Sequence, residues 1–302
     1  MASGEPNTKK MREDQTISEG MLLGMGNPLL DVAAVVTKEF LDKYELLPDN
    51  AILADAKHKD IFEDMHQFTE VEFTPGGATQ NTLRTAQWMT GSPEFATLFF
   101  GCIAKDRHGD IMTKAMKEGS VKTVYQINGS NSEPTGTCAV CITGNNRSLV
   151  ANLASANCFT KAHLDDKANW AHVERAKLVY TAEAEAFSEA QGFGTKDVKE
   201  IALKAASLPK HNSKRSRTVV ITQGAEPTII VEGGKLTEYA IIPIEKEKIV
   251  DTNGAGDAFV GGYLSQLMLE RSTEQCVRAA NYVANLIIQR HGCTFTEKCV
   301  YE

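Results

Sequence analysis

The run DTNGAGD at residues 251–257 combines a glycine turn with a carboxylate, and it lies between an apolar strand-like segment (241–250) and a helix-like periodic segment (259–268). A strand that turns through glycines into a helix presents unpaired backbone N–H groups at the positive end of the helix dipole, which is a site for an anion. Asp257 adds a carboxylate beside that anion, so the pattern favours a base that deprotonates a hydroxyl for attack on a phosphate. The alternative is an ordinary glycine turn with a first-turn acid that the dipole stabilises.

Two further groups of polar residues could serve such a site. Gly76 and Gly77 precede a predicted helix, where paired glycines let the backbone approach a ligand and place Asn81 on the first turns. The same pattern also fits a plain strand-to-helix turn with a solvated Asn81. Asn27 and Asp31 interrupt an apolar segment, either as turn formers or as hydrogen-bonding partners of a polyhydroxyl ligand, and the pattern leaves both readings open.

A dinucleotide site at GMGNPLL is excluded. Leu29 stands where the third glycine of that fingerprint is required, and no helix follows at once. The segment from 21 to 36 is therefore predicted as strand, tight connection and strand.

The composition excludes several classes of protein. The 302 residues carry a net charge of −7, which argues against a general nucleic-acid or membrane binder. Seven scattered cysteines suggest reduced thiols in a cytosolic protein. Residues 1–20 are polar, which predicts a disordered leader without a secretory apolar core, and no apolar run reaches transmembrane length.

The elements that must position these residues alternate between strand and helix. Buried strands are predicted at 96–103 and 218–225, a short strand at 178–180, and helices at 109–118, 195–207 and 276–290. Such alternation predicts an α/β fold with a mainly parallel sheet flanked by helices and ligands at the carboxyl ends of its strands, where Gly224 and Asp257 would lie. Residues 40–65 are predicted as two helices joined around 47–50.

Residues 134–150 are predicted to form a β-hairpin. Cys138 and Cys141 make a CxxC within it, but on a strand they point to opposite faces, and no second pair follows at zinc-ribbon spacing, so a metal site is not expected. Arg147, just past the hairpin tip, is either a solvated turn residue or a phosphate contact.

Several stretches together resemble a known family. GGATQN (76–81) and DTNGAGDAFVGG (251–262) resemble the ribokinase-like (PfkB) carbohydrate kinases. GMGNPLLD (24–31), the hairpin with its flanks (134–153) and HGCTFTEK (291–298) are most similar to the adenosine kinase branch of that family. The similarity extends over nearly the whole chain after residue 20.

The resemblance implies a ribokinase-like domain over 21–302 with a small β-rich lid inserted from about 31–76 and 133–156. It implies transfer of the ATP γ-phosphoryl group to the 5′-hydroxyl of adenosine to give AMP, a step of purine salvage, with Mg²⁺. It implies Asp257 as the general base and an anion hole made of Gly254, Ala255 and Gly256. The residues that it places on the nucleoside are Asn27, Asp31, Gly76, Gly77 and Asn81. It places Arg147 on the transferring phosphate, and on the ATP side Thr222, Gly224 and Asn253. Glu183 would hold the metal through water.

The chain departs from this family after Ala182. The family has a longer segment there, and two missing βα units correspond to on the order of 50 to 60 residues. Glu183 matches the last residue of the family's N-x-x-E motif, whereas Tyr180 stands where its Asn is expected. The loss removes aromatic contacts to the adenine and exposes sheet edges. Ala51 replaces a Gln that contacts the purine in some members.

Three functions are therefore considered. The first is an adenosine kinase, a cytoplasmic monomer with the nucleus as a second compartment, whose partners are adenosine and ATP rather than nucleic acid or membrane. The second is a catalytically impaired isoform or paralogue that binds a nucleoside or a partner. The third is another PfkB-type sugar or nucleoside kinase.

Overall fold

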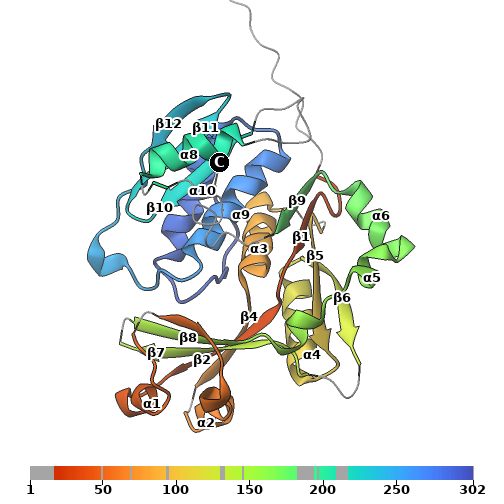
Figure 1. Ribbon diagram of the computed structural model, residues 1–302, viewed down its shortest axis with the longest axis vertical. Helices are drawn as coiled ribbons and strands as arrows, with labels where there is room; N and C mark the ends of the chain where they lie inside the picture. Colours follow the sequence, from red (N-terminus) through yellow and green to blue (C-terminus); the bar gives the residue numbers. More distant parts are fainter. Residues whose placement is uncertain are drawn as a thin grey trace, which may run out of the picture.

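The computed structural model describes residues 17–48, 50–68, 70–92, 95–129, 133–144, 146–181, 194–195, 197–208 and 217–301. Within these residues the strands form three sheets, two of them in the main body and one in a lid below it (Figure 1). Glu183 and the helix expected to begin near it lie outside the described residues, as do residues 1–16 of the expected leader.

The first sheet of the main body is parallel, in the order β6-β5-β1-β9. Its strands are β1 (Leu22–Met25), β5 (Thr97–Ala104), β6 (Lys122–Asn128) and β9 (Leu178–Thr181). Leu98, Phe99 and Phe100 on β5 are fully buried. This confirms the prediction that the apolar run at 96–103 is a buried parallel strand, because such strands are covered on both faces.

Helices cover this sheet. The helices α4 (Arg107–Glu118), α5 (Lys161–Asp165) and α6 (Lys167–Arg175) lie around its outer part (Figure 1). Asp106 caps α4 by accepting from the backbone N–H of Gly109 at 2.8 Å, so that helix begins close to where the sequence predicted it.

Three helices pack side by side in the centre: α3 (Ala78–Thr90), α9 (Ala255–Met268) and α10 (Thr273–Ile287). Their close approach depends on glycine. A Cβ on Gly261 of α9 would lie 2.5 Å from the Cβ of Thr85 on α3, and one on Gly262 would lie 2.5 Å from Val283 Cγ1 on α10. Gly261 therefore sets how closely α9 approaches α3, and Gly262 sets how closely it approaches α10.

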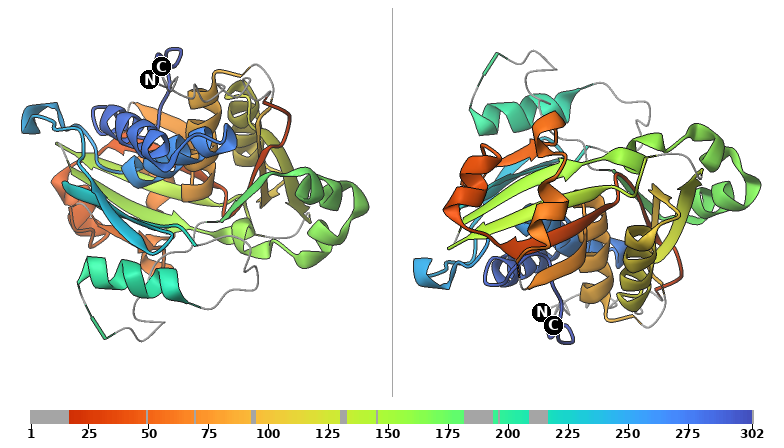
Figure 2. Two further views of the ribbon diagram at one scale, coloured as in Figure 1. Left: turned by 90° about the horizontal axis from the view of Figure 1, so that it is seen from above. Right: turned by 90° about the horizontal axis from the view of Figure 1, so that it is seen from below.

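The second sheet of the main body is antiparallel, with strands β10 (Val219–Gln223), β11 (Glu226–Glu232) and β12 (Lys235–Tyr239). The helix α8 (Val198–Ser207) covers one face, and α9 and α10 lie on the other (Figure 2). The prediction that residues 218–225 form a buried strand of the parallel sheet is wrong, because β10 is only partly buried and lies in the antiparallel sheet. Gly224 turns β10 directly into β11 with φ of +61°, so β10 pairs antiparallel with its neighbour in the chain. Among the described strands β10 pairs with none of the parallel sheet.

The lid sheet has the order β3-β8-β7-β2-β4. Its strands are β2 (Leu29–Val35), β3 (Ala51–Leu53), β4 (Val71–Gly76), β7 (Thr137–Thr143) and β8 (Asn146–Asn152). The predicted strand pair at 21–36 is confirmed, although its two strands join different sheets. The predicted hairpin is β7 and β8.

The helices α1 (Lys38–Lys43) and α2 (Ile61–Met65) cover the outer face of the lid. The prediction of two helices at 40–65 is correct for the helices but misses β3 and a 3₁₀ turn at Ala56–His58 between them. Because β3 is short and pairs with β8, nearly a hundred residues away in the chain, no local pattern reveals it.

The two thiols of the CxxC lie on opposite faces of the lid sheet, as predicted. Cys141 packs in the cluster under α1 and α2, and Cys138 packs in the cluster on the inner face. Burial raises the pKa of Cys141 to about 12 and that of Cys138 well above its ordinary value. Both side chains therefore act as small apolar residues of the lid core.

The described end of the leader is attached to the fold. Glu19 forms an ion pair with Lys122 at 2.5 Å, and the backbone N–H of Gly20 donates to Phe95 O at 2.8 Å. The expected boundary at residue 20 is therefore too late by at least two residues. No helix in the described ranges is long and apolar enough to cross a membrane.

Candidate active site

A cavity of about 420 Å³ lies between the inner face of the lid and the N-terminal ends of α3 and α9. The lid contributes Asp31 and Arg147, and α3 contributes Asn81 with Gly77 before it. The remaining wall comes from the turn before α9 and from the loop after α10. Residues that the sequence singled out separately thus line one space: Asp31, Gly77, Asn81, Arg147, Asn253, Gly254 and Asp257.

The turn before α9 has the backbone geometry that an anion site requires. Gly254 is the N-cap residue with φ of +76°, a conformation that favours glycine. Ala255, Gly256 and Asp257 form the first helical turn, whose N–H groups have no intrahelical acceptor, although the N–H of Ala255 reaches Thr252 O at 3.3 Å. A Cβ on Gly256 would meet nothing within 4 Å, so this part of the turn faces open space.

Asp257 is held by α3. The side-chain amide of Asn81 donates to Asp257 Oδ2 at 3.1 Å, and Thr82 Oγ1 donates to the Asp257 carbonyl at 3.2 Å. Burial raises the pKa of Asp257 above its ordinary value, and the hydrogen bond from Asn81 opposes that rise. A carboxylate with a raised pKa is a stronger proton acceptor while it remains ionised at neutral pH, as a general base must be.

Arg84 orients the side-chain amide of Asn81. Its Nη1 donates to Pro75 O at 2.8 Å and lies 3.5 Å from Asn81 Oδ1. With its oxygen turned towards the guanidinium, the Asn81 amide presents its NH₂ group to Asp257. Sequence reasoning did not identify Arg84, because an Arg one helical turn after an Asn is a common surface pattern.

Asp31 is the second carboxylate of the cavity. Burial raises its pKa to about 7, Arg84 and Arg147 oppose the rise, and the nearby Asp257 adds to it. Gly76 packs directly on this carboxyl group, since a Cβ there would lie 2.1 Å from Asp31 Oδ1. The role of Gly76 in this structure is therefore to leave room for Asp31.

Asn27 and Gly76 lie next to the cavity without being among its lining residues. The backbone carbonyl of Asn27 faces Gly77, where a Cβ would approach it to 2.5 Å, and Gly77 has φ of +87°. The Asn27 side chain is exposed. In this structure Asn27 contributes through its backbone, by shaping the turn that carries Gly77.

Arg147 is buried, which rules out the solvated alternative. Its side chain is 7% exposed; Nε lies 3.1 Å from Asp251 Oδ2, and Nη2 lies 2.7 Å from His291 Nδ1. The lid is thus joined to the main body at the turn before α9. Sequence reasoning missed Asp251 and His291 as residues of the site, although Asp251 is the first residue of the DTNGAGD run.

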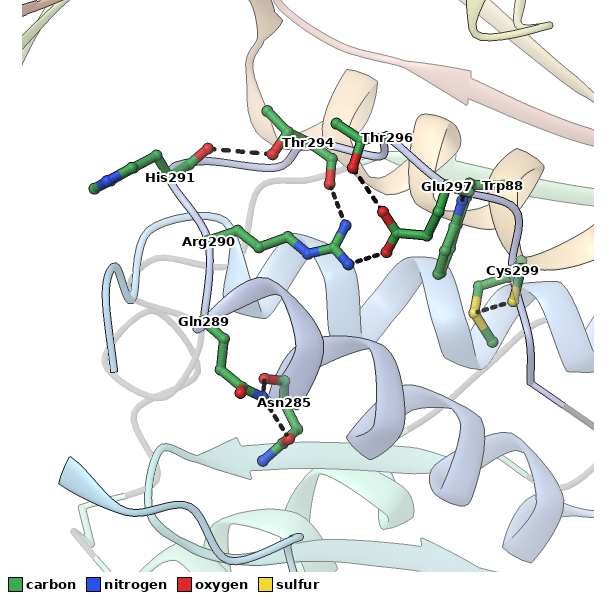
Figure 3. Close-up of polar contacts among 10 residues, drawn as sticks. Trp88, Asn285, Gln289, Arg290, His291, Thr294, Thr296, Glu297 and Cys299 are labelled. Atoms are coloured by element: carbon green, nitrogen blue, oxygen red, sulfur yellow. Dashed lines mark hydrogen bonds and ion pairs between the residues drawn. The ribbon is translucent and has the colours of Figure 1, made fainter. Parts of the chain in front are cut away.

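The loop after α10 is fixed on α3. Arg290 donates to Thr294 O at 3.1 Å and pairs with Glu297, and Trp88 Nε1 donates to the Glu297 carbonyl at 2.6 Å (Figure 3). The Trp88 ring stacks on Phe295 with centroids 4.9 Å apart. These contacts hold His291 and the two residues after it against the turn before α9.

A second cavity of about 310 Å³ lies on the other side of the same turn. Thr222 and Gly224 line it, as do Ala255 and Gly256. Most of its other lining residues are apolar, among them Ile241, Ile242, Ile244, Ile249, Phe259, Ala284 and Ile288, and the polar ones include Asn281 and Asn285. A planar base fits such a lining, and the turn forms the wall between the two cavities. Asn253, expected on the ATP side, lines the first cavity.

The described residues contain no group of three or more His, Cys, Asp or Glu side chains arranged to hold a metal ion. Mg²⁺ in phosphoryl-transfer sites is held largely by water and substrate phosphates with one or two carboxylates, so it does not need such a group. Glu183, the predicted contributor, lies outside the described residues.

The comparisons with known proteins identify the family of the chain. The model of the pfkB family of carbohydrate kinases matches residues 40–189 and 181–299. Adenosine kinase 2 of Arabidopsis thaliana is 43% identical over 337 residues, covering 93% of this chain and 97% of the relative. Adenosine kinase of Saccharomyces cerevisiae is 33% identical, with 93% and 98% covered.

Solved structures give the same result. Anopheles gambiae adenosine kinase in complex with P1,P4-di(adenosine-5) tetraphosphate superimposes with a TM-score of 0.85 at 36% identity, covering 94% of this chain and 100% of that chain. Schistosoma mansoni adenosine kinase in complex with adenosine, in an occluded loop conformation, gives 0.84 at 27% identity, with 93% and 98% covered. These matches confirm the predicted ribokinase-like α/β fold class.

The alignment with the Arabidopsis relative is longer than this chain. Since 93% of 302 residues is about 281, about 56 of the 337 aligned positions have no residue here. The two matches to the family model overlap at 181–189. The absence of a segment after Ala182 stays a prediction. From the family match and from relatives that align over almost their full length, the chain is a member of the pfkB family of carbohydrate kinases.

Proposed function

We propose that this protein is an ATP-dependent adenosine kinase that transfers the γ-phosphoryl group of ATP to the 5′-hydroxyl of adenosine and forms AMP and ADP, a step of purine salvage. The observation that carries the proposal is the Asn81–Asp257 pair at a helix N-terminus that separates two cavities. The relatives and solved structures reported above are adenosine kinases.

In this reaction Asp257 removes the proton of the 5′-hydroxyl. The hydroxyl oxygen forms a bond to the γ-phosphorus while the bond from that phosphorus to the ADP oxygen breaks. Phosphoryl transfer depends mainly on positioning and on electrostatic stabilisation. The N–H groups at Gly254, Ala255 and Gly256 and the guanidinium of Arg147 supply that stabilisation, and one such donor is worth about 3 kcal/mol.

The nucleoside occupies the first cavity. Asp31 and Asn81 face it from the lid and from α3 and hydrogen-bond the ribose hydroxyls, with Gly77 allowing close approach of the backbone. The apolar inner face of the lid, with Val140, Ile142 and Leu149, covers the base. A lid over the reacting groups excludes water that would otherwise accept the phosphoryl group.

ATP occupies the second cavity, with its base on the apolar lining and its phosphates at the turn. Thr222 and Gly224 stand at the end of β10 and contact the nucleotide, while Asn253 lies where the two substrates meet. Glu183 would hold Mg²⁺ through water, and the ion would supply positive charge to offset that of the ATP phosphates. The protein acts as a cytoplasmic monomer, with the nucleus as a second compartment, and binds neither nucleic acid nor membrane.

The catalytically impaired alternative is favoured by one observation. The consecutive strands β9 and β10 belong to different sheets, so β9 ends the parallel sheet with an edge that no other described strand pairs. Val179 on that edge is 53% exposed. An uncovered edge presents unpaired backbone N–H and C=O groups, so in the impaired alternative the parallel sheet is less well held at the carboxyl ends of its strands.

The proposal is tested by measuring ADP release with adenosine, inosine and ribose as acceptors, alongside calorimetric titration with adenosine. Turnover with adenosine well above that with inosine and ribose is the expected result. Adenosine binding without turnover would select the impaired alternative. Preferred turnover of ribose or inosine would select another kinase of the family.

A further inference from the structure

One buried carboxylate joins three segments of the chain. Asp251 Oδ1 accepts from the backbone N–H of Asn253 at 2.9 Å, and Oδ2 accepts from the backbone N–H of Gly292 at 2.9 Å. Oδ2 also faces Arg147 Nε at 3.1 Å. The partners come from the turn before α9, the loop after α10 and the lid strand β8.

The hydrogen bonds of Asp251 offset the free-energy cost of removing its charge and that of Arg147 from water. The Asp251 side chain is 2% exposed and that of Arg147 is 7% exposed. A buried ion pair is retained at little cost only when further hydrogen bonds satisfy both groups, and loss of one partner leaves an uncompensated charge. The two backbone N–H groups provide that compensation for Asp251.

The guanidinium is held at a second point. Arg147 Nη2 lies 2.7 Å from His291 Nδ1, so a neutral imidazole with its proton on Nε2 accepts this hydrogen bond. Two contacts on different nitrogens fix the plane of a guanidinium as well as its position. His291 itself is exposed and lines the first cavity.

We propose that Asp251 is a positioning residue for phosphoryl transfer, which with His291 fixes Arg147 against the turn that carries the anion-binding N–H groups. Closure of the lid and assembly of the phosphate site are then a single event, because the same carboxylate holds the Asn253 backbone. This inference rests on the proposed function, in which Arg147 meets the transferring phosphate.

A purely structural role would use the same hydrogen bonds but would not act through Arg147. The location of the three residues favours the positioning role. Arg147, Asp251 and His291 all line the first cavity, as does Asp257. An ion pair that only joined the lid to the body could sit anywhere along their boundary.

The first experiment is a double-mutant cycle in kcat. Asp251→Asn is expected to lower kcat about 100-fold, the cost of misplacing a positioned group by about 1 Å, with a smaller change in the KM for adenosine. Arg147→Gln is expected to lower kcat by a similar factor. The double variant should lose little more than either single variant, because Asp251 acts through Arg147. A double variant whose loss is the product of the two single losses would overturn the proposal.

Asp106→Asn is the matched control. Asp106 also accepts from two backbone N–H groups, those of Gly109 and Thr135, each at 2.8 Å, but it lines neither cavity. This variant should lose thermal stability and keep kcat. If it lowered kcat as much as Asp251→Asn does, the effect at Asp251 would be general destabilisation and the proposal would fall.

His291 offers a pair of variants on an exposed residue, where folding is not at risk. His291→Gln keeps an acceptor near the guanidinium, and His291→Leu removes it. The Leu variant should lower kcat several-fold at unchanged KM for ATP, and the Gln variant should recover most of the loss. Equal activity of the two variants would remove His291 from the proposal.

Amide hydrogen exchange tests the positioning without any reliance on catalysis. In Asp251→Asn the N–H groups of Asn253 and Gly292 and the strand β8 should exchange faster than in the parent protein, and in Arg147→Gln only β8 should do so. If the parent protein has no kinase activity, the proposed function fails while this exchange pattern still tests the contact. Unchanged exchange in β8 would overturn the positioning role.

Discussion

Asn81 and Asp257 are 176 residues apart in the chain, yet the Asn81 amide donates to Asp257 Oδ2 at 3.1 Å. The contact exists because α3 and α9 cross closely at their N-terminal ends. The helix that follows the paired glycines and the helix that follows the DTNGAGD turn thus present their first turns to each other. The base of the proposed reaction is oriented by a residue of the opposite helix.

Replacement of Asp257 by Asn should nearly abolish turnover and leave adenosine binding largely intact. The variant keeps the shape of the side chain but removes the proton acceptor, and a general base contributes about 10² to 10⁴ in rate. Initial rates and calorimetric binding of adenosine measure the two effects separately. Turnover within a factor of a few of the parent would contradict the role of Asp257 as base.

Replacement of Asn81 by Leu should raise the pKa of Asp257 further. Burial raises that pKa and the Asn81 hydrogen bond opposes the rise, so its removal leaves burial unopposed. Because the base must be ionised, the acidic limb of the profile of kcat against pH should move to higher pH. An acidic limb that stays in place or moves to lower pH would show that Asn81 does not control the ionisation of Asp257.

The stability of the protein should fall as the pH rises from about 4 to about 7 through the contribution of Asp31. Its pKa is about 7 in the folded protein against an ordinary value of 3.8, so the folded state binds the extra proton in this window. The contribution is fully present below the ordinary value and is lost as the pH rises through the folded value, with a slope of at most about 1.4 kcal/mol per pH unit.

Asp31→Asn is the variant that tests this contribution, since it is neutral at every pH. Denaturant titrations of both proteins between pH 4 and 8 should give a difference in unfolding free energy that changes steadily with pH in favour of the variant. A difference that does not depend on pH would mean that the pKa of Asp31 in the folded protein is not raised.

Gly261→Ala should separate α3 from α9. The added Cβ would lie 2.5 Å from Thr85 Cβ and 2.6 Å from the Thr82 carbonyl, and overpacking of this kind costs about 1 to 3 kcal/mol. Both the melting temperature and kcat should fall, because the Asn81–Asp257 contact depends on this crossing.

Gly119→Ala is the control for this substitution, since its nearest atoms would lie at an ordinary 3.5 Å and its φ is negative. It should leave both quantities nearly unchanged. If Gly261→Ala also left the melting temperature and kcat unchanged, the Asn81–Asp257 contact would not depend on the close crossing of α3 and α9.

The part of the site that could be predicted from the sequence is the part encoded in short runs. The DTNGAGD turn specifies its own geometry, because Gly254 supplies the positive φ and the helix follows at once. Gly77 and Asn81 are likewise fixed by one strand-to-helix turn. For these residues the local sequence is enough to predict the position in the fold.

The part that could not be predicted depends on packing between distant segments. The sequence allows Arg147 to be either a solvated turn residue or a phosphate contact, and only the packing of the lid on the main body brings Asp251 and His291 to its guanidinium. The pairing of β3 with β8 and of β10 with β11 was missed for the same reason. A short strand has no preference for its partner until the rest of the sheet is in place.

The wall between the two cavities is a single helical turn, with Gly254 and Asp257 on one side and Ala255 and Gly256 on the other. In the proposed reaction the nucleoside and the nucleotide therefore lie in separate cavities and are present together when the phosphoryl group passes. The reaction therefore needs no covalent phosphoryl-enzyme intermediate. Steady-state kinetics should consequently follow a ternary-complex scheme, and initial-rate lines at different adenosine concentrations should intersect rather than run parallel.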